Sequence, residues 1–456
     1  MTGHDMVLHG ATGVVGQLIA NCLARHPESS RTSWAIAGRN PEKLARLRDA
    51  LAAQGTEPGV IVVQAADEAS VQAMVADTKV VLNAAGPFSL YHGDHIVGAC
   101  ARSGVHYADL SGEYHFQRRM VDDFHSEAER TGAKVVLAAG VDSIPSDLGV
   151  QLAIEQLSAN GAKVRQIKAL FTGYTGSFSG GTRRSMRVRQ EIKESSEYEA
   201  GFHIDPYVLA PSAERTHDGE TVAGWDSYRF DTDFRRFGGP FFMAPINARI
   251  VRRSLALDGH LPCTYEEGIS VAALQKAFWL YASRGFGYFV GAPIPFRPKP
   301  GEGPPPWLQR AGRFCVRIHA ATEDRSKTAL VEVRGAGDPG YLATSKMLTE
   351  VGFALLLGDE ASGRAGVLTP ATALGPVLRR RLCQAEEGRF MQFRILDART
   401  AQPMPSCSCL GPRPPGRGPG LGREDVCEPD AVGHGVVVVA ACVRDALLPT
   451  LDSRRK

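Results

Sequence analysis

HGATGVVG, residues 9–16, is the stretch of sequence that decides the fold. It follows a short apolar run at 6–9 and opens a helical stretch at 13–25. Gly10 allows a tight turn, Gly13 lets the backbone approach a pyrophosphate, and Gly16 permits close packing of the helix on the strand. The amides at the start of that helix can then donate to phosphates. The spacing therefore predicts a dinucleotide-binding turn.

Strands and helices alternate from this turn onward. The predicted strands are 6–9, 34–37, 60–64, 80–83, 105–108 and 135–138. The predicted helices between them are 13–25, 41–53, 68–76, 93–103 and 116–131. Nearly continuous apolar strands are typical of a parallel sheet that is covered on both faces. We therefore predict an α/β fold with an N-terminal Rossmann domain, a doubly wound parallel sheet, over residues 1–150.

The pattern changes after Gly140. Strands are expected at 164–178, 314–321 and 329–334, with a helix at 341–357. The charged residues of 183–200 recur at helical spacing, which is typical of a solvated helix face. We interpret residues 151–396 as a second, α+β domain with a mainly antiparallel sheet.

Composition limits the classes of partner. The 456 residues carry a net charge of +3, which gives no strong electrostatic case for nucleic acid. Residues 1–8 lack the basic and apolar regions of a secretory signal, so none is expected. The nine cysteines form no CxxC pair, which indicates neither a disulfide framework nor a metal site. We expect an intracellular, cytoplasmic protein.

Two segments stand apart from this organisation. Residues 277–296, AFWLYASRGFGYFVGAPIPF, are apolar and aromatic, but they are divided by Arg284 and are too short to span a bilayer. They are interpreted as a buried helix or pocket wall, or as a peripheral membrane or lipid-droplet contact through 278–296. Residues 397–456 form a low-complexity tail that is rich in proline and glycine at 403–430, and we expect it to be disordered.

The end of the second predicted strand indicates which nicotinamide cofactor is preferred. An NAD site places an acid here for the ribose 2′-hydroxyl, but residues 36–40 contain none. Arg39 occupies the position and Lys43 follows one helical turn later. Two cations suit a 2′-phosphate, so we predict NADP.

Further candidates follow the later strands. Asp67 is placed either to reach the adenine edge or to cap the next helix. The small residues Ala85, Gly86 and Pro87 follow the fourth strand at the edge where cofactors lie in open α/β sheets. The complete set expected to bind the cofactor is Gly10, Thr12, Gly13, Val14, Val15, Gly16, Arg39, Lys43, Asp67, Ala85, Gly86 and Pro87.

The catalytic acid has no spacing signature. Tyr107, Ser143 and Tyr174 are weak candidates, and Ser143, like Asp142, could equally cap a helix. No tyrosine in the chain has a lysine four residues later, which argues against the chemistry of short-chain dehydrogenases.

Five motifs occur in order: GATGVVG at 10–16, AGRNPEKL at 37–44, NAAGPF at 83–88, YADLSGE at 107–113 and GVDSIPSD at 140–147. With the later pieces GGT at 180–182 and GVLTPA at 366–371, this order resembles the saccharopine dehydrogenase-like oxidoreductases. It is most similar to the branch that contains the mycobacterial trans-acting enoyl reductases and an animal saccharopine dehydrogenase-like oxidoreductase. The resemblance covers about residues 5–396 and ends before the tail.

The resemblance implies an NADP(H)-binding Rossmann domain and a second domain that closes over a substrate. It also implies lipid metabolism, since bacterial members reduce enoyl intermediates for cell-wall glycolipids and the animal member is associated with lipid droplets. We therefore expect an NADP-dependent oxidoreductase that reduces an enoyl or carbonyl substrate of lipid or polyketide type. The alternative is a catalytically silent nucleotide-binding protein at a lipid-droplet or membrane surface. The sequence does not determine the oligomeric state.

Overall fold

The computed structural model describes residues 3–408 apart from a set of gaps. The gaps are 160, 177–183, 186, 189, 193–197, 199–200, 212–223, 276–302, 305, 359–362 and 398–399. The candidate membrane contact at 278–296 and most of the tail therefore lie outside the described residues. Among the residues that are described, no helix has both the length and the apolar character needed to cross a bilayer.

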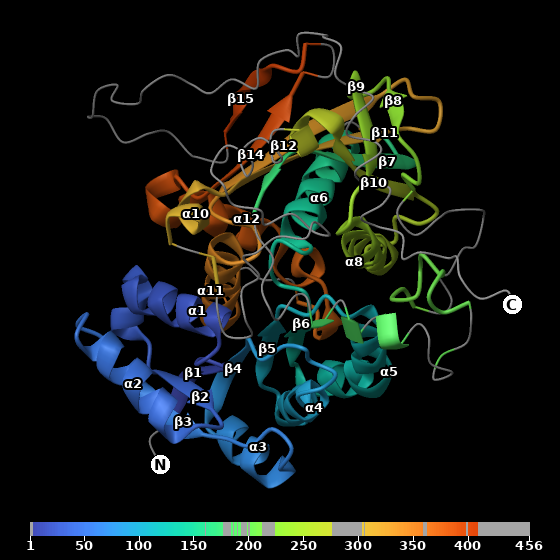
Figure 1. Ribbon diagram of the computed structural model, residues 1–456. Helices are drawn as coiled ribbons and strands as arrows, with labels where there is room; N and C mark the ends of the chain where they lie inside the picture. Colours follow the sequence, from blue (N-terminus) through green and yellow to red (C-terminus); the bar gives the residue numbers. More distant parts are fainter. Residues whose placement is uncertain are drawn as a thin grey trace, which may run out of the picture.

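A seven-stranded parallel sheet, sheet A, forms the lower half of the molecule in Figure 1. Its strands are β1 (His4–His9), β2 (Trp34–Gly38), β3 (Gly59–Val62), β4 (Thr78–Asn83), β5 (His106–Asp109), β6 (Lys134–Val136) and β13 (Gly366–Leu368). They lie in the order β13-β6-β5-β4-β1-β2-β3, with every pair parallel. The strand order reverses at β1, where the glycine turn begins. The predicted Rossmann architecture is confirmed.

Helices cover both faces of sheet A. They are α1 (Val14–Arg25), α2 (Pro41–Ala52), α3 (Glu68–Val75), α4 (Gly93–Ser103), α5 (Tyr114–Thr131) and α11 (Leu342–Leu357), and a short 3-10 helix, η1 (Pro27–Arg31), follows α1. Met6 and Leu8 of β1 pack into the core beneath α1, α2 and α11, whereas Val7 packs into the core beneath α3, α4 and α5. The two-residue period of a strand thus explains why β1 is apolar throughout.

An eight-stranded sheet, sheet B, forms the upper half. Its strands are β7 (Gln166–Thr175), β8 (Arg229–Asp231), β9 (Arg236–Pro240), β10 (Thr264–Ser270), β11 (Arg313–Ala321), β12 (Thr328–Ala336), β14 (Met391–Leu396) and β15 (Pro403–Ser408). Their order is β15-β14-β12-β11-β7-β10-β9-β8, and β7 with β10 is the parallel pair among antiparallel ones. The predicted second domain with a mainly antiparallel sheet is confirmed as an architecture.

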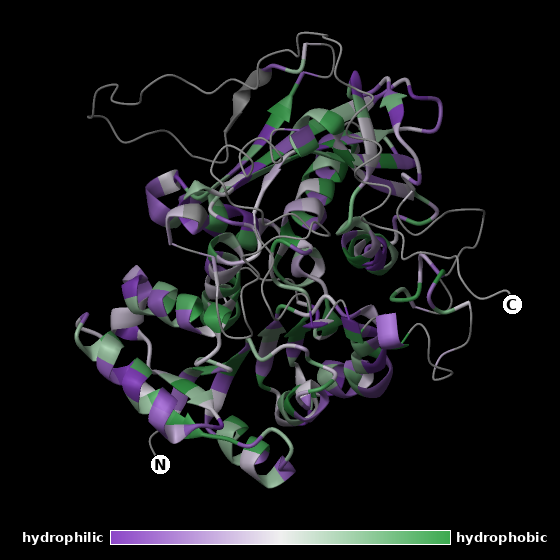
Figure 2. Cartoon of the chain, viewed as in Figure 1, coloured by the Kyte–Doolittle hydropathy of each residue, from purple (hydrophilic) through white to green (hydrophobic). Residues whose placement is uncertain are grey.

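The helices α6 (Ile144–Ser158), α8 (Ala244–Leu257) and α12 (Pro370–Gly388) join the two layers, and the short α10 (Pro306–Ala311) precedes β11. α6 packs on β11 and β12 so closely that a side chain at Gly149 would overlap Ile318. Figure 2 shows hydrophobic colouring on much of α11, while α2 and α5 carry hydrophilic residues outward. One cluster of buried apolar residues extends from sheet A to sheet B, so the core is continuous between the two layers.

Two strands cross the divisions expected from the sequence. β13 follows α11 in the chain, within the segment 151–396, yet it pairs with β6 and completes the edge of sheet A. β15 lies within the tail 397–456 and pairs with β14 at the edge of sheet B. Residues 409–456 lie outside the described part.

Two carboxyl groups are fully buried between the layers. Asp147 of α6 accepts hydrogen bonds from the Ser254 hydroxyl and from the Ala371 amide at the start of α12 (2.5 and 2.8 Å). Glu267 of β10 accepts from Ser146, Tyr265 and Asn247 (2.8, 2.7 and 2.6 Å). Burial raises the pKa of both groups to about 7.

The unfolding free energy should therefore depend on the protonation of Glu267. Its pKa is about 7 in the folded protein and close to 4.5 when the group is exposed, so the folded state holds the proton over a wider range. The stability that this proton provides is present below about pH 4.5 and is lost as pH rises through about 7. We expect the free energy of unfolding of the wild type to fall between pH 5 and pH 8 by about 1–3 kcal/mol more than that of Glu267→Gln. Urea unfolding at the two pH values measures this difference.

The exposed Glu387, whose side chain is 86% accessible, supplies the matched control Glu387→Gln. That variant should follow wild type at both pH values. Identical pH dependence in wild type and Glu267→Gln would contradict the prediction.

Candidate functional site

The glycine turn after β1 lies against the loop that follows β4. Gly10 has a φ of +74°, and a Cβ there would lie 2.7 Å from the Ala85 nitrogen. A Cβ at Gly16 would overlap the carbonyl oxygen of Gly10. Glycine at these two positions is therefore a steric requirement of the turn itself.

The turn presents open backbone amides at the start of α1. Gly13 is the N-cap residue and no side chain caps the helix, so the first-turn amides, including those of Val14 and Val15, lack intrahelical acceptors. The Gln17 side chain donates to the carbonyl of Thr12 (3.0 Å), which holds the approach to the helix. Free amides at a helix start, together with the helix dipole, fit a diphosphate.

Three loops meet at this edge of sheet A. The amides of Gly10 and Ala11 both donate to the carbonyl of Ala37 at the end of β2 (3.0 and 3.3 Å). The amide of Ala84, after β4, donates to the carbonyl of His9 (3.0 Å). The structure thus brings the glycine turn beside the segment that leads to Arg39 and beside 85–87, as the topology predicts.

Arg39 and Lys43 lie on the surface beyond β2. Both side chains are exposed, and neither forms an ion pair with the described residues. Asn40 caps α2 by accepting from the Lys43 amide (2.9 Å), which fixes the backbone that carries both cations. Two unpaired cations beside the glycine turn fit a 2′-phosphate, and this contact stays a prediction.

Asp67 is the N-cap residue of α3. Its carboxylate accepts from the amide of Ala69 (3.1 Å), and its side chain is exposed. The capping alternative weighed for this residue is therefore observed, while its contact with adenine stays a prediction.

A buried polar chain fixes the carboxyl edge of the sheet. The His9 ring donates to Asn83, Asn83 donates to the Tyr107 hydroxyl, and Tyr107 donates to Asp109 (2.9, 3.0 and 3.1 Å). Asn83 also accepts from the Ala85 amide (3.0 Å). Tyr107 is 0% exposed, and burial raises its pKa well above the ordinary value. This catalytic candidate is thus enclosed and already bonded, which suits a positioning role.

The hydroxyl of Ser143 is also already hydrogen-bonded. It stands at the N-cap position of α6, but its hydroxyl donates to the carbonyl of Ala138 (2.6 Å) and it does not cap the helix. Asp109 accepts from the Ala138 amide (3.0 Å) and, because burial dominates, its pKa rises to about 6. The loops after β5 and β6 therefore come together as expected, with Ser143 bonded within them.

Glu113 holds the loop after β4 in place, although sequence reasoning gave it no role. It is 0% exposed and accepts hydrogen bonds from the amides of Phe88 and Ser89 (2.9 and 3.2 Å) and from the hydroxyls of Ser89 and Ser185 (2.5 and 3.1 Å). The sequence signal that could have drawn attention to Glu113 is its position immediately before a long amphipathic helix. Glu113 therefore positions the residues that follow Gly86 and Pro87.

Tyr174 belongs to an aromatic group from sheet B. Its half-buried ring meets the rings of Phe171, Phe241 and Phe242 edge-on, at 5.9, 5.3 and 5.7 Å. The chain continues from Phe242 into α8, where Ile246 lies against Gly112 in the loop after β5 of sheet A. The aromatic group therefore approaches the same carboxyl edge as the glycine turn.

A cavity lies elsewhere in the described part of the molecule. It measures about 1100 Å³ and is lined by the second half of α1, by α11 and by the end of α12. Its lining starts at Leu18 and contains none of the predicted cofactor residues. We therefore place the candidate site at the carboxyl edge of sheet A.

Comparison with known proteins gives the family. Residues 6–136 match the model of the saccharopine dehydrogenase NADP-binding domain. A trans-acting enoyl reductase of Mycobacterium tuberculosis is 32% identical over 404 residues, covering 83% of this chain and 95% of the relative. One of Mycobacterium ulcerans is 31% identical over 406 residues, covering 83% and 96%. The chain belongs to the saccharopine dehydrogenase-like family.

This member of the saccharopine dehydrogenase-like family groups with proteins named trans-acting enoyl reductases and is an NADP-dependent oxidoreductase. A solved apo saccharopine dehydrogenase (L-Glu forming) from Saccharomyces cerevisiae is 13% identical, with a TM-score of 0.49 and coverage of 87% of this chain and 100% of that one.

Replacing Gly13 should weaken NADPH binding without unfolding the protein. A Cβ at Gly13 would meet the Gly10 carbonyl oxygen at 3.3 Å, and the backbone φ of −72° is ordinary for alanine. The added methyl group would instead occupy the space that a diphosphate needs. For Gly13→Ala we expect NADPH to bind at least about tenfold more weakly by isothermal titration.

Gly201→Ala is the control, because a Cβ there meets nothing within 4 Å. Wild-type NADPH affinity in Gly13→Ala would contradict the predicted diphosphate contact. A thermal unfolding midpoint near that of wild type in both variants separates loss of binding from loss of fold.

Reversing the charge at Arg39 should change the cofactor preference. Arg39→Asp removes one cation beside the 2′-phosphate and adds an acid that repels it. NADPH affinity should fall by about 10- to 100-fold, while NADH affinity should not fall. Arg46→Asp, on the exposed side of α2, should leave the ratio of the two affinities unchanged. An unchanged ratio in Arg39→Asp would refute the assignment.

Proposed function

We propose that this oxidoreductase uses NADPH to reduce the carbon–carbon double bond of an enoyl substrate of lipid or polyketide type, within lipid or glycolipid metabolism. The observation that carries the proposal is the open glycine turn beside two cations that form no ion pair with any described residue, in a chain whose relatives are named trans-acting enoyl reductases. Those names describe the relatives, and we extend their reaction class to this chain.

Different residues at the carboxyl edge would bind different parts of the cofactor. The amides after Gly13 would hold the diphosphate, Arg39 and Lys43 the 2′-phosphate, and the loop held by Glu113 the nicotinamide half. Bound NADPH supplies the hydride. The protein must then stabilise the negative charge that develops on the substrate carbonyl and deliver a proton to the α-carbon.

We propose Tyr174 as the proton donor. Tyr107 and Ser143 are each 0% exposed, so neither hydroxyl is accessible to a substrate. Tyr174 is half-buried and comes from the opposite layer, where its neighbours are aromatic. An apolar surround suits an acyl chain and leaves the phenol as the polar group in contact with it.

We further propose that, within residues 151–396, the part built on sheet B closes over the substrate, because α11 and β13 of the same segment belong to the layer of sheet A. The stretch from Phe241 to Ile246 supports this proposal, since it runs from the aromatic group to the loop after β5, where Ile246 lies against Gly112.

NADPH oxidation with a panel of enoyl thioesters, ketones and imines tests the function. We expect turnover with medium- or long-chain enoyl thioesters and little with imines. Tyr174→Phe should lower kcat by about 100-fold or more while keeping the NADPH dissociation constant. Tyr228→Phe, at a tyrosine that is 44% exposed, is the matched control and should retain activity.

The outcomes test the reductase reaction and the identity of the proton donor separately. Enoyl turnover that survives in Tyr174→Phe would overturn the proton donor and leave the reductase in place. Tight NADPH binding with no turnover on any substrate would overturn the reductase and favour the catalytically silent alternative. In that case, binding to phospholipid vesicles would show whether the protein acts at a lipid surface.

A further inference from the structure

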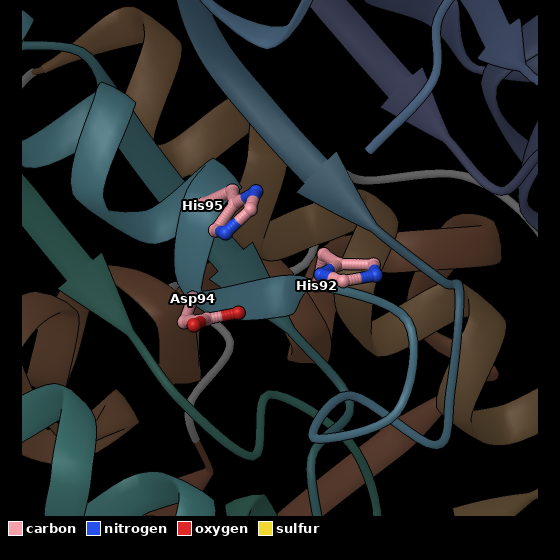
Figure 3. Close-up of side chains that lie close together, drawn as sticks. All are labelled: His92, Asp94 and His95. Carbon is pink, nitrogen blue, oxygen red and sulfur yellow. The ribbon is translucent and has the colours of Figure 1, made fainter. Parts of the chain in front are cut away.

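Two histidines and an aspartate gather at the start of α4, away from the groups assigned above. Each of His92, Asp94 and His95 offers one ligand atom, and these three atoms lie within 4.8 Å of one another. Figure 3 shows the three side chains together at the beginning of the helix. The imidazole rings of His92 and His95 have centroids 5.0 Å apart. Imidazole with carboxylate is a donor set that transition metals accept.

The ring of His95 is already oriented as a ligand. Its Nδ1 lies 2.9 Å from the carbonyl oxygen of Ala65. A carbonyl can only accept, so Nδ1 carries the proton and the lone pair lies on Nε2. Metal-bound histidines commonly donate their second ring nitrogen to a carbonyl in this way, because the bond fixes both tautomer and orientation.

The charges around the cluster are balanced by two acids. Asp94 accepts one hydrogen bond from Arg119 through Oδ2 (2.9 Å), which leaves Oδ1 for a metal. Glu68 places Oε1 4.0 Å from Nε2 of His95. The start of α4 carries the positive end of the helix dipole, and Arg119 adds a full charge, so both carboxylates are needed to favour a cation.

We propose that His92, Asp94 and His95 bind a divalent transition-metal ion of the zinc class, with Glu68 as the fourth ligand. In a tetrahedral zinc site the ligand atoms stand about 3.3 Å apart, whereas the three atoms here lie within 4.8 Å of one another, so the side chains would draw together when the metal binds. None of these residues belongs to the predicted cofactor set, and the site does not depend on the proposed reaction.

The position of the site gives it a structural consequence. Ala65 lies between β3 and α3 and Glu68 begins α3, whereas His92 and His95 lie at the start of α4, after β4. Both segments follow the carboxyl ends of strands of sheet A, and the first of them contains Asp67, the residue predicted to reach the adenine. A metal ion would therefore join two loops that border the cofactor, and would raise the thermal unfolding midpoint when it binds.

Zn²⁺ titration of the chelator-treated full chain, in competition with a chromophoric chelator, tests the site. We expect one ion per chain, with affinity at least about tenfold lower in His92→Ala and His95→Ala. His260→Ala, in the turn after α8, is the control and should bind as wild type does. Equal affinity in wild type and His95→Ala would overturn the proposal.

Two further measurements address the geometry. Arg119→Gln removes the cation that donates to Asp94, so the affinity for Zn²⁺ should rise. If the cluster has only a structural role, the affinity for Zn²⁺ should not change. Glu68→Gln should weaken binding if this carboxylate is the fourth ligand.

Discussion

The close approach of Gly10 to Ala85 is the contact on which the site depends. The backbone of one loop lies so near the backbone of another that no Cβ fits between them, and Gly10 also needs its positive φ. This contact brings the loop after β4 beside the first turn of α1. The sheet order reverses at β1, so the helices leave to opposite faces of the sheet at the glycine turn. The open amides of the turn, which are predicted to bind phosphate, and the placing of 85–87 are therefore consequences of one steric arrangement.

Rigidity at this edge comes from buried polar bonds rather than from apolar packing. The chain from His9 through Asn83 and Tyr107 to Asp109 crosses three adjacent strands, and each member satisfies its neighbour. A buried network of this kind is stable only when its groups are paired, so it fixes the ends of the strands in one arrangement. Glu113 extends the same principle to the loop after β4. A hydroxyl that maintains such a network is poorly suited to releasing its proton to a substrate.

Local patterns were sufficient to predict sheet A and its cofactor turn. The glycine spacing, the apolar strands and the cations at 39 and 43 all act over a few residues, and they led to the correct order of elements. The pairing of β13 with β6 could not be predicted, since strands 232 residues apart, with Gly366 paired to Lys134, leave no periodic signal of their contact. The same holds for Tyr107 and Ser143, whose position at the right edge was predictable while their bonds to Asp109 and Ala138 depend on the folded backbone. The tail illustrates the reverse case, because composition favoured disorder where β15 finds an edge strand to pair with.

The separation between the two layers explains why the cofactor is easier to infer than the substrate. The glycine turn, Arg39 and Lys43 are predicted to contact only the nucleotide, and they all come from the first 43 residues. The other end of the site is bordered by Tyr174, Phe241 and Phe242, which belong to β7 and to the entry of α8. Aromatic side chains there offer area and few polar groups, so they favour an apolar acyl chain over the dicarboxylate of a saccharopine-type substrate. In the proposed site, specificity for the substrate therefore depends on the contacts of sheet B, and the nucleotide motifs carry no information about it.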